Sequence, residues 1–151
     1  MTVRDVIDDV TIGCLESVSF PQLGISDVLA KVDTGAYSGA LHCTDIKVVK
    51  RGKDKTRVLK YNPLGKKSLA QETTDFQETF VRSASGHRKK RFVIVTKLVL
   101  EGKEYTTKIG LSERKTMRRE VLLGRRFLRE NNIIVDVRIN SELDDEGENT
   151  R

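Results

Sequence analysis

The sequence has few cysteines and no long hydrophobic run, and both features narrow the class of protein. Its 151 residues include only two cysteines, Cys14 and Cys43. They fit a reducing compartment, where thiols pack as small hydrophobic groups, and we expect no disulfide between them. No apolar run approaches the roughly 20 residues of a membrane-spanning helix. Residues 1–10 carry acids where a secretion signal carries basic and then apolar residues. We therefore expect a cytoplasmic protein with no membrane partner.

The sequence also lacks the common motifs of metal and nucleotide sites. It contains neither His-Glu-x-x-His nor a Cys-x-x-Cys pair, which are spacings that hold zinc. His42 and Cys43 are adjacent on an expected strand, so their side chains would point to opposite faces. No Gly-x-x-x-x-Gly-Lys-Ser/Thr loop is present to hold nucleotide phosphates. We expect neither a metal site nor a cofactor.

Positive charge is unevenly distributed, and aromatic side chains are few. The chain has a net charge of +6, and residues 141–151 hold five acids against one arginine. That leaves a net charge of +10 for residues 1–140. Such a charge attracts acidic partners, although it also keeps small proteins soluble. The eight aromatic residues do not alternate with the basic run at 88–91, and nucleic acid is therefore not expected as a partner.

The length and the hydrophobic pattern predict one mostly β domain. A chain of 151 residues is long enough to bury a single core. We expect that domain to span residues 1–140 and residues 141–151 to form an acidic, disordered tail. Short strands, tight turns and one helix favour a closed or nearly closed β-barrel. The expected strands are 11–20, 28–33, 40–50, 56–61, 77–82, 91–100, 104–111, 121–123 and 133–137, with a surface loop at 62–75 and a helix at 125–131.

One strand ends in an unusual place for a charge. The apolar run 28–32 leads directly to Asp33, and Thr34 and Gly35 follow in a turn. A carboxylate at the end of a core strand is costly unless it is hydrogen-bonded. One interpretation is an Asx-turn, in which Asp33 accepts hydrogen bonds from nearby backbone N–H groups. The other is a functional carboxylate.

Three ordered motifs favour the functional interpretation. They are Asp-Thr-Gly-Ala-Tyr-Ser-Gly-Ala-Leu-His at 33–42, Arg-Ser-Ala-Ser-Gly-His at 82–87, and the segment 117–128 with Leu-Leu-Gly-Arg. Together they resemble the retroviral-type aspartic proteases and the bacterial retropepsin-like family often labelled ATP-dependent zinc proteases. The resemblance covers roughly residues 14–137. It implies a closed retropepsin-like (acid protease) β-barrel with one short C-terminal helix, and Asp33 as the catalytic residue.

The implied chemistry needs a second carboxylate. Two close carboxylates that share one proton activate a water molecule and polarise the scissile carbonyl. The sequence holds a single Asp-Thr-Gly, and Asp136, in another apolar strand, lacks the Thr-Gly turn. The second carboxylate should then be Asp33 of another subunit, which predicts a homodimer.

The resemblance also assigns supporting and substrate-binding residues. The active-site turn would be supported by Thr34, Gly35, Ala36, Leu123 and Gly124. The hairpin at 85–87 corresponds to a flap that closes over substrate, and basic residues around it would face an acidic peptide. The residues expected to bind substrate are Ser85, Gly86, His87, Arg88, Arg118 and Arg125. Family members are often found beside ligases that add glutamates, which is consistent with a glutamate-rich substrate. Alternatively, a basic hairpin is a solvated edge that discourages sheet-to-sheet pairing.

Some positions depart from the family pattern. Tyr37, Gly39 and Cys43 replace a basic residue, a small hydroxyl residue and an alanine, and the first two affect the expected substrate preference. Retroviral enzymes place an acid shortly after Asp-Thr-Gly to pair with the helix arginine, but no carboxylate stands there to pair with Arg125. Two other functions remain open: a non-catalytic barrel that binds nucleic acid or acidic protein, and a zinc metallopeptidase.

Overall fold

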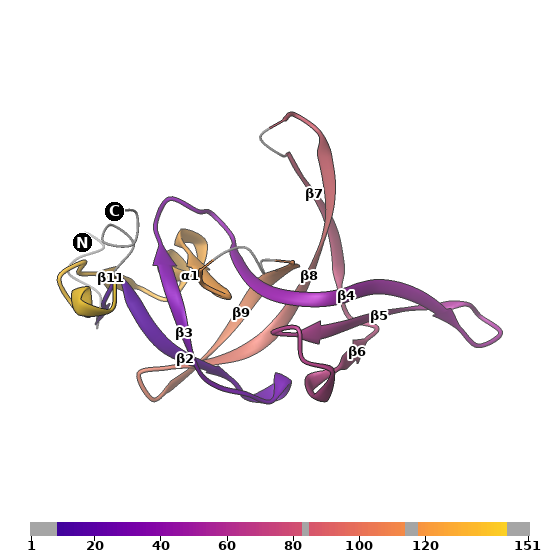
Figure 1. Cartoon of the computed structure of the whole chain (residues 1–151), viewed down its shortest axis with the longest axis horizontal. Coiled ribbons are helices and arrows are strands. Elements are labelled where there is room, and N and C mark those ends of the chain that lie inside the picture. The colour runs from indigo at the N-terminus through magenta and orange to yellow at the C-terminus, as the bar shows by residue number, and fades with distance from the viewer. Residues whose placement is uncertain (1–8, 83–84, 114–117, 145–151) are drawn as a thin grey trace, which may run out of the picture.

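Six strands close into a barrel in the computed structural model, which describes residues 9–82, 85–113 and 118–144. Going round the barrel, each strand pairs with the next, and the last pairs with the first. This closure confirms the predicted mostly β barrel with one short helix (Figure 1). The six strands in this order are β10 (Val121–Gly124), β3 (Ile25–Asp33), β2 (Leu15–Phe20), β8 (Arg88–Leu100), β9 (Lys103–Ser112) and β4 (Gly39–Arg51).

Alternating side chains fill the barrel. In β9, Tyr105, Thr107 and Ile109 are buried, whereas Thr106 and Lys108 between them are exposed. This period of two is what one buried face of a strand requires. The core includes the fully buried side chains of Phe20, Leu41, Leu98, Leu100 and Leu123. The turn between β8 and β9 matches the predicted hairpin, with Glu101 and Gly102 both at positive φ.

Five strands of the described residues lie outside the ring. β7 (Gln77–Arg82) pairs with the first half of β8 to form a hairpin, and β5 (Thr56–Pro63) and β6 (Gln71–Thr73) extend the sheet beyond β4. β1 (Val10–Ile12) and β11 (Ile133–Val135) form a separate two-stranded parallel sheet. The helix α1 (Arg125–Glu130) follows β10 directly, and 3-10 turns occupy Pro21–Leu23, Lys67–Leu69 and Ser141–Leu143.

The predicted continuous strand at 11–20 is wrong, because the strand is interrupted at Gly13 and Cys14. A Cβ at Gly13 would overlap the carbonyl oxygen of Ile139, so the two backbones meet there without room for a side chain. The Gly13 N–H donates to the buried carboxylate of Glu16 at 2.7 Å. The residues before the break then pair with β11 as β1, and those after it pair with β3 as β2.

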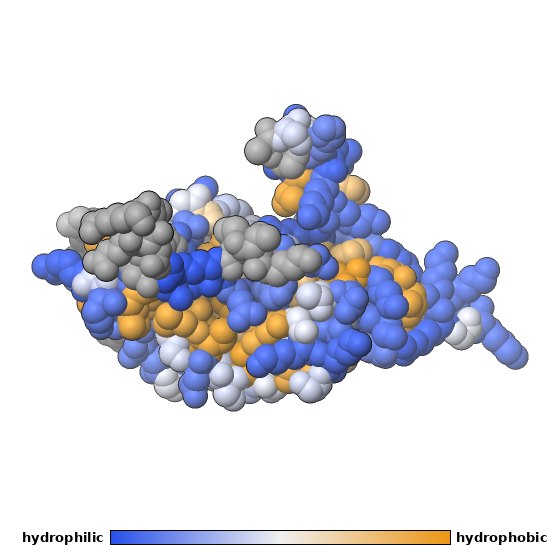
Figure 2. Space-filling model, viewed as in Figure 1, coloured by the Kyte–Doolittle hydropathy of each residue, from blue (hydrophilic) through white to orange (hydrophobic). Residues whose placement is uncertain are grey.

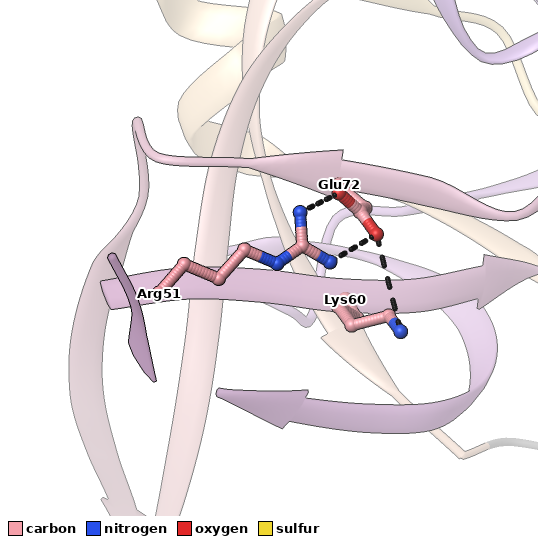
Figure 3. A network of polar contacts seen from close by, with 3 residues as sticks. All are labelled: Arg51, Lys60 and Glu72. Atoms are coloured by element: carbon pink, nitrogen blue, oxygen red, sulfur yellow. Dashed lines mark hydrogen bonds and ion pairs between the residues drawn. The ribbon is translucent and has the colours of Figure 1, made fainter. Parts of the chain in front are cut away.

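The predicted loop at 62–75 is also wrong in part. Pro63 still belongs to β5, and β6 returns along β5 with Leu59 opposite Thr73. Figure 3 shows how this outer sheet is held together: Arg51 on β4 donates to both carboxylate oxygens of Glu72 on β6, at 2.5 and 2.7 Å. The Lys60 ammonium on β5 lies 3.9 Å from the same carboxylate. Arg51 therefore lowers the pKa of Glu72 below its ordinary value.

The acidic segment that the sequence predicts to be disordered begins with an ordered turn. Ser141–Leu143 forms a 3-10 helix, and the Arg119 guanidinium donates to the Leu143 carbonyl oxygen at 3.1 Å. Residues 145–151 lie outside the described residues. Within the described ranges, no helix is long and apolar enough to cross a bilayer.

Candidate active site

Asp33 is the last residue of β3 and begins a tight turn. Its side chain is half-buried, and its Oδ1 accepts a hydrogen bond of 3.0 Å from the Gly35 N–H. Its carbonyl oxygen accepts a further bond of 3.2 Å from the Ala36 N–H. The Asx-turn interpretation is therefore confirmed as geometry. It is compatible with a functional carboxylate, because the turn fixes the position of a partly exposed acid.

The strand β10 supports this turn from the side. It runs parallel to β3, with Leu123 opposite Val32 and Gly124 opposite Asp33. Leu123 is buried in the core. A Cβ at Gly124 would lie 2.6 Å from the carbonyl oxygen of Tyr37, so only glycine lets the backbone after Asp33 pass this close.

Arg125 ties the turn to the start of α1. Its guanidinium Nη1 donates to the carbonyl oxygen of Gly35 at 3.0 Å and lies 3.5 Å from that of Thr34. Its backbone N–H donates to the Ala36 carbonyl oxygen at 2.8 Å, and the guanidinium carbon lies 5.5 Å from the centre of the Tyr37 ring. Backbone carbonyls and an aromatic ring thus take the place of the carboxylate that the sequence lacks.

Asp136, the other carboxylate that the sequence analysis considered, is paired with Arg138. The Asp136 carboxylate accepts hydrogen bonds of 2.9 and 2.7 Å from the Arg138 guanidinium and one of 3.0 Å from its backbone N–H. These contacts lower the pKa of Asp136 to about 2. A carboxylate held ionised in this way is a poor proton-sharing partner for Asp33.

The predicted flap is a projecting hairpin made of β7 and β8. Figure 1 and Figure 2 show it standing clear of the barrel, on the side to which the β3–β4 turn also points. Ser85, Gly86, His87 and Arg88 are exposed at its tip, and the Ser85 hydroxyl lies 3.2 Å from Nδ1 of His87. The Arg88 guanidinium stacks 4.3 Å from the centre of the Phe80 ring. Arg118, just before β10, is also exposed.

A groove of about 270 Å³ lies between the base of this hairpin, the segment after the Asp33 turn, and α1. Its lining includes the cationic residues Arg91, Lys108 and Arg126. Arg91 ends the basic run 88–91 and Arg126 lies in the third motif, but none of the three is among the residues expected to bind substrate. They come from β8, β9 and α1, so no local sequence pattern connects them. The pairing of β8 with β9, in which Val93 lies opposite Gly110, brings Arg91 and Lys108 to one sheet. The helix α1 adds Arg126.

The cysteine and histidine side chains considered as metal ligands do not form a cluster in the described residues. Within the described part of the chain, no three His, Cys, Asp or Glu side chains gather in a way that could hold an ion. Cys14 is half-buried and Cys43 fully buried, and both are free thiols. Burial raises the pKa of Cys43 to about 12, which disfavours the thiolate that zinc binds. His42 is a buried residue of β4 whose backbone N–H donates to the Glu120 carbonyl oxygen at 2.8 Å.

One family model covers most of the chain. Residues 11–143 match the model of the RimB-like family, described as retropepsin-like aspartic endopeptidase RimB. A protein of unknown function from Legionella pneumophila has a similar structure, with a TM-score of 0.62 and 25% identity over 86% of this chain and 94% of that one.

The curated relatives carry a different name. A "Probable alpha-L-glutamate ligase" of Desulfotalea psychrophila is 31% identical over 126 residues, which is 82% of this chain and 27% of the ligase. One from Shewanella pealeana is 30% identical over 128 residues, 83% of this chain and 28% of the ligase. The chain thus spans little more than a quarter of the length of these two relatives.

Proposed function

Because this chain belongs to the RimB-like family, described as retropepsin-like aspartic endopeptidase RimB, we propose that it is an aspartic peptidase whose catalytic unit is a homodimer. The observation that carries the proposal is the Asp33 turn. A partly exposed carboxylate is held by the Gly35 N–H and flanked by β10. Arg125 fixes the turn that follows it by donating to the Gly35 carbonyl oxygen. Such fixed geometry is what a catalytic acid or base requires.

The reaction would use two Asp33 carboxylates that share one proton. The ionised carboxylate takes a proton from a water molecule, whose oxygen attacks the scissile carbonyl carbon. The protonated carboxyl of the other subunit donates its proton to the carbonyl oxygen, which gives a tetrahedral diol. Transfer of a proton to the amide nitrogen then allows the C–N bond to break. The two carboxyls titrate as one unit, so their apparent pKa values belong to the pair.

An apolar surface near the C-terminal strand supports the proposed dimer. Ile134 on β11 is 48% exposed, Val137 is 69% exposed, and Ile139 and Leu143 are 39% and 41% exposed. These four are half of the eight exposed large hydrophobic residues in the described part of the chain, and they all lie within residues 134–143. Exposed apolar side chains gathered in one segment mark interaction surfaces, and a second copy of the chain would bury them.

We propose a glutamate-rich peptide as the substrate. The basic body of the protein favours acidic partners, and the curated relatives that contain a matching region are named as glutamate ligases. A peptidase for glutamate-rich chains would act on the type of bond that such ligases form.

The test compares peptide cleavage by the wild type, Asp33→Asn and Asp54→Asn, each with and without a chelator. Asp54 lies exposed in the distant β4–β5 turn and provides a matched control for the change of charge. We expect Asp33→Asn to reduce the rate by at least about 10³-fold, while Asp54→Asn and the chelator leave it unchanged. Cleavage that survives Asp33→Asn, or that the chelator abolishes, would refute the aspartic mechanism.

A second experiment tests the dimer. Val137→Asp places a charge in the apolar segment, so sedimentation should show a monomer and cleavage should disappear. Mixing Asp33→Asn with wild type should also lower activity more than dilution does, because mixed dimers lack one carboxylate. A fully active monomer would contradict the proposal.

A non-catalytic role is the second candidate, favoured by the small fraction of each ligase that this chain covers. The chain would then bind acidic peptide without cutting it. In that case a labelled glutamate peptide would bind wild type and Asp33→Asn alike, and no cleavage would be found.

A further inference from the structure

The groove beside the Asp33 turn has the lining of a binding pocket for an acidic side chain. One wall is formed by Ser38 and Gly39, which follow Asp33 by five and six positions. The lining also includes Thr79 of β7, at the base of the β7–β8 hairpin. A peptide that passes from Asp33 beneath the hairpin would therefore place a neighbouring side chain in this groove.

The charge of the lining is positive. Arg91, Lys108 and Arg126 are its cations and Glu130 is its single anion, which gives a net charge of +2 for the lining residues. The Arg126 Nε donates to the Glu130 carboxylate at 2.7 Å within α1. The other two cations, Arg91 and Lys108, lie on the floor formed by β8 and β9.

Arg91 is held in a defined place on that floor. A Cβ at Gly110 would lie 2.6 Å from Nε of Arg91 and 3.0 Å from its Cζ. The guanidinium therefore lies directly over the backbone of Gly110, and the missing side chain provides its space. A preorganised guanidinium binds a carboxylate with less loss of side-chain entropy than a mobile one.

The remaining lining fits the rest of an acidic side chain. Phe80, Val93 and Phe127 present apolar surface. Apolar contacts suit a methylene stem, and cationic donors suit the carboxylate at its end. A short aliphatic stem ending in a carboxylate is the chemistry of glutamate.

We propose that this groove is a specificity pocket in which Arg91, with Lys108 beside it, binds the side-chain carboxylate of an acidic residue near the scissile bond. The inference rests on the proposed peptidase function and deepens it, because it assigns substrate preference to particular residues. Arg91 contacts substrate in this scheme, and Gly110 is a positioning residue.

The experiment measures kcat/KM for two peptides that differ only in glutamate against glutamine. The variants are Arg91→Gln, Lys108→Gln and Gly110→Ala, with Lys53→Gln as the control, since Lys53 is exposed in the distant β4–β5 turn. We expect wild type and Lys53→Gln to prefer the glutamate peptide, and Arg91→Gln to reduce that preference about 10-fold or more. Gly110→Ala should reduce it without changing any charge. Cleavage of the glutamine peptide should change little, whereas damage to the fold would slow both peptides.

A charge reversal and a binding assay complete the test. Arg91→Glu should shift the preference toward a lysine peptide. Binding of a fluorescent hexaglutamate peptide to Asp33→Asn, which does not depend on cleavage, should weaken about 10-fold when Arg91→Gln is added. If nothing is cleaved but this binding depends on Arg91, the pocket stands and the peptidase proposal fails. If Arg91→Gln changes neither preference nor binding, the pocket is refuted while the peptidase proposal stands on its own test.

Discussion

The guanidinium of Arg125 donates a hydrogen bond of 3.0 Å to the backbone carbonyl oxygen of Gly35. The first residue of α1 thereby fixes the turn that presents Asp33, although the two residues are 90 positions apart in the sequence. No carboxylate is needed for this role, because two carbonyl oxygens and the Tyr37 ring surround the guanidinium. We therefore propose that Arg125, which the resemblance assigned to substrate binding, positions the turn of the proposed dyad.

Replacing Arg125 should loosen the active-site turn. In Arg125→Ala, the Gly35 carbonyl oxygen loses its charged donor, at a cost of about 1–2 kcal/mol of stability. Because Asp33 would then be misplaced, we expect the cleavage rate to fall about 100-fold. Urea unfolding and peptide cleavage measure the two effects. Arg129→Ala, an exposed position on the same helix, is the control, and equal losses in both variants would contradict the assigned role.

Gly124→Ala should displace the chain that follows Asp33. The new Cβ would lie 2.6 Å from the Tyr37 carbonyl oxygen and 2.7 Å from the Ser38 carbonyl carbon, and backbone atoms cannot move aside independently. Such overpacking costs about 1–3 kcal/mol, and activity should fall with it. Gly52→Ala is the control: its φ of +74° strains alanine, but nothing lies within 4 Å. It should lose stability and keep its activity per folded molecule.

Glu16→Gln should change how stability depends on pH. Burial, assisted by the nearby Glu101 carboxylate, raises the pKa of Glu16 above its ordinary value of 4.5. A raised pKa gives stability that is complete below 4.5 and is lost as the pH rises through the folded-state pKa. Relative to wild type, Glu16→Gln should therefore become more stable between pH 4.5 and 7. Urea titrations at both pH values measure this difference, and an equal pH dependence in the wild type and Glu16→Gln would contradict it.

Cys43 should not react in the native protein. Its side chain is fully buried, and burial raises the pKa of its thiol from 9.0 to about 12. The thiolate is the reactive form, so alkylation at pH 8 should modify half-buried Cys14 first and Cys43 only after unfolding. Mass spectrometry of the alkylated peptides distinguishes them. The same shift implies that stability falls as the pH rises from 9 toward 12. Equal labelling of both thiols in the native protein would contradict this prediction.

The sequence predicts the strands and turns well where their causes are local. Alternating burial in β9 and the Glu101-Gly102 turn follow from neighbouring residues. The prediction fails at Gly13, where the break in the strand depends on the distant Ile139 backbone. It also misses β6, because three polar residues become a strand only by pairing with β5.

The candidate site also combines a local feature that the sequence predicts with tertiary contacts that it does not predict. The sequence by itself determined the Asp33 turn, since the hydrogen bond from Gly35 to Asp33 spans two residues and depends on turn chemistry alone. Only the tertiary structure decided what surrounds that turn. Gly124 lies opposite Asp33 through parallel strand pairing, and Arg125 reaches Gly35 from the end of the same strand. Arg91 reaches Gly110 through the register of β8 and β9. These contacts join residues distant in the chain, and the closure of the barrel sets them.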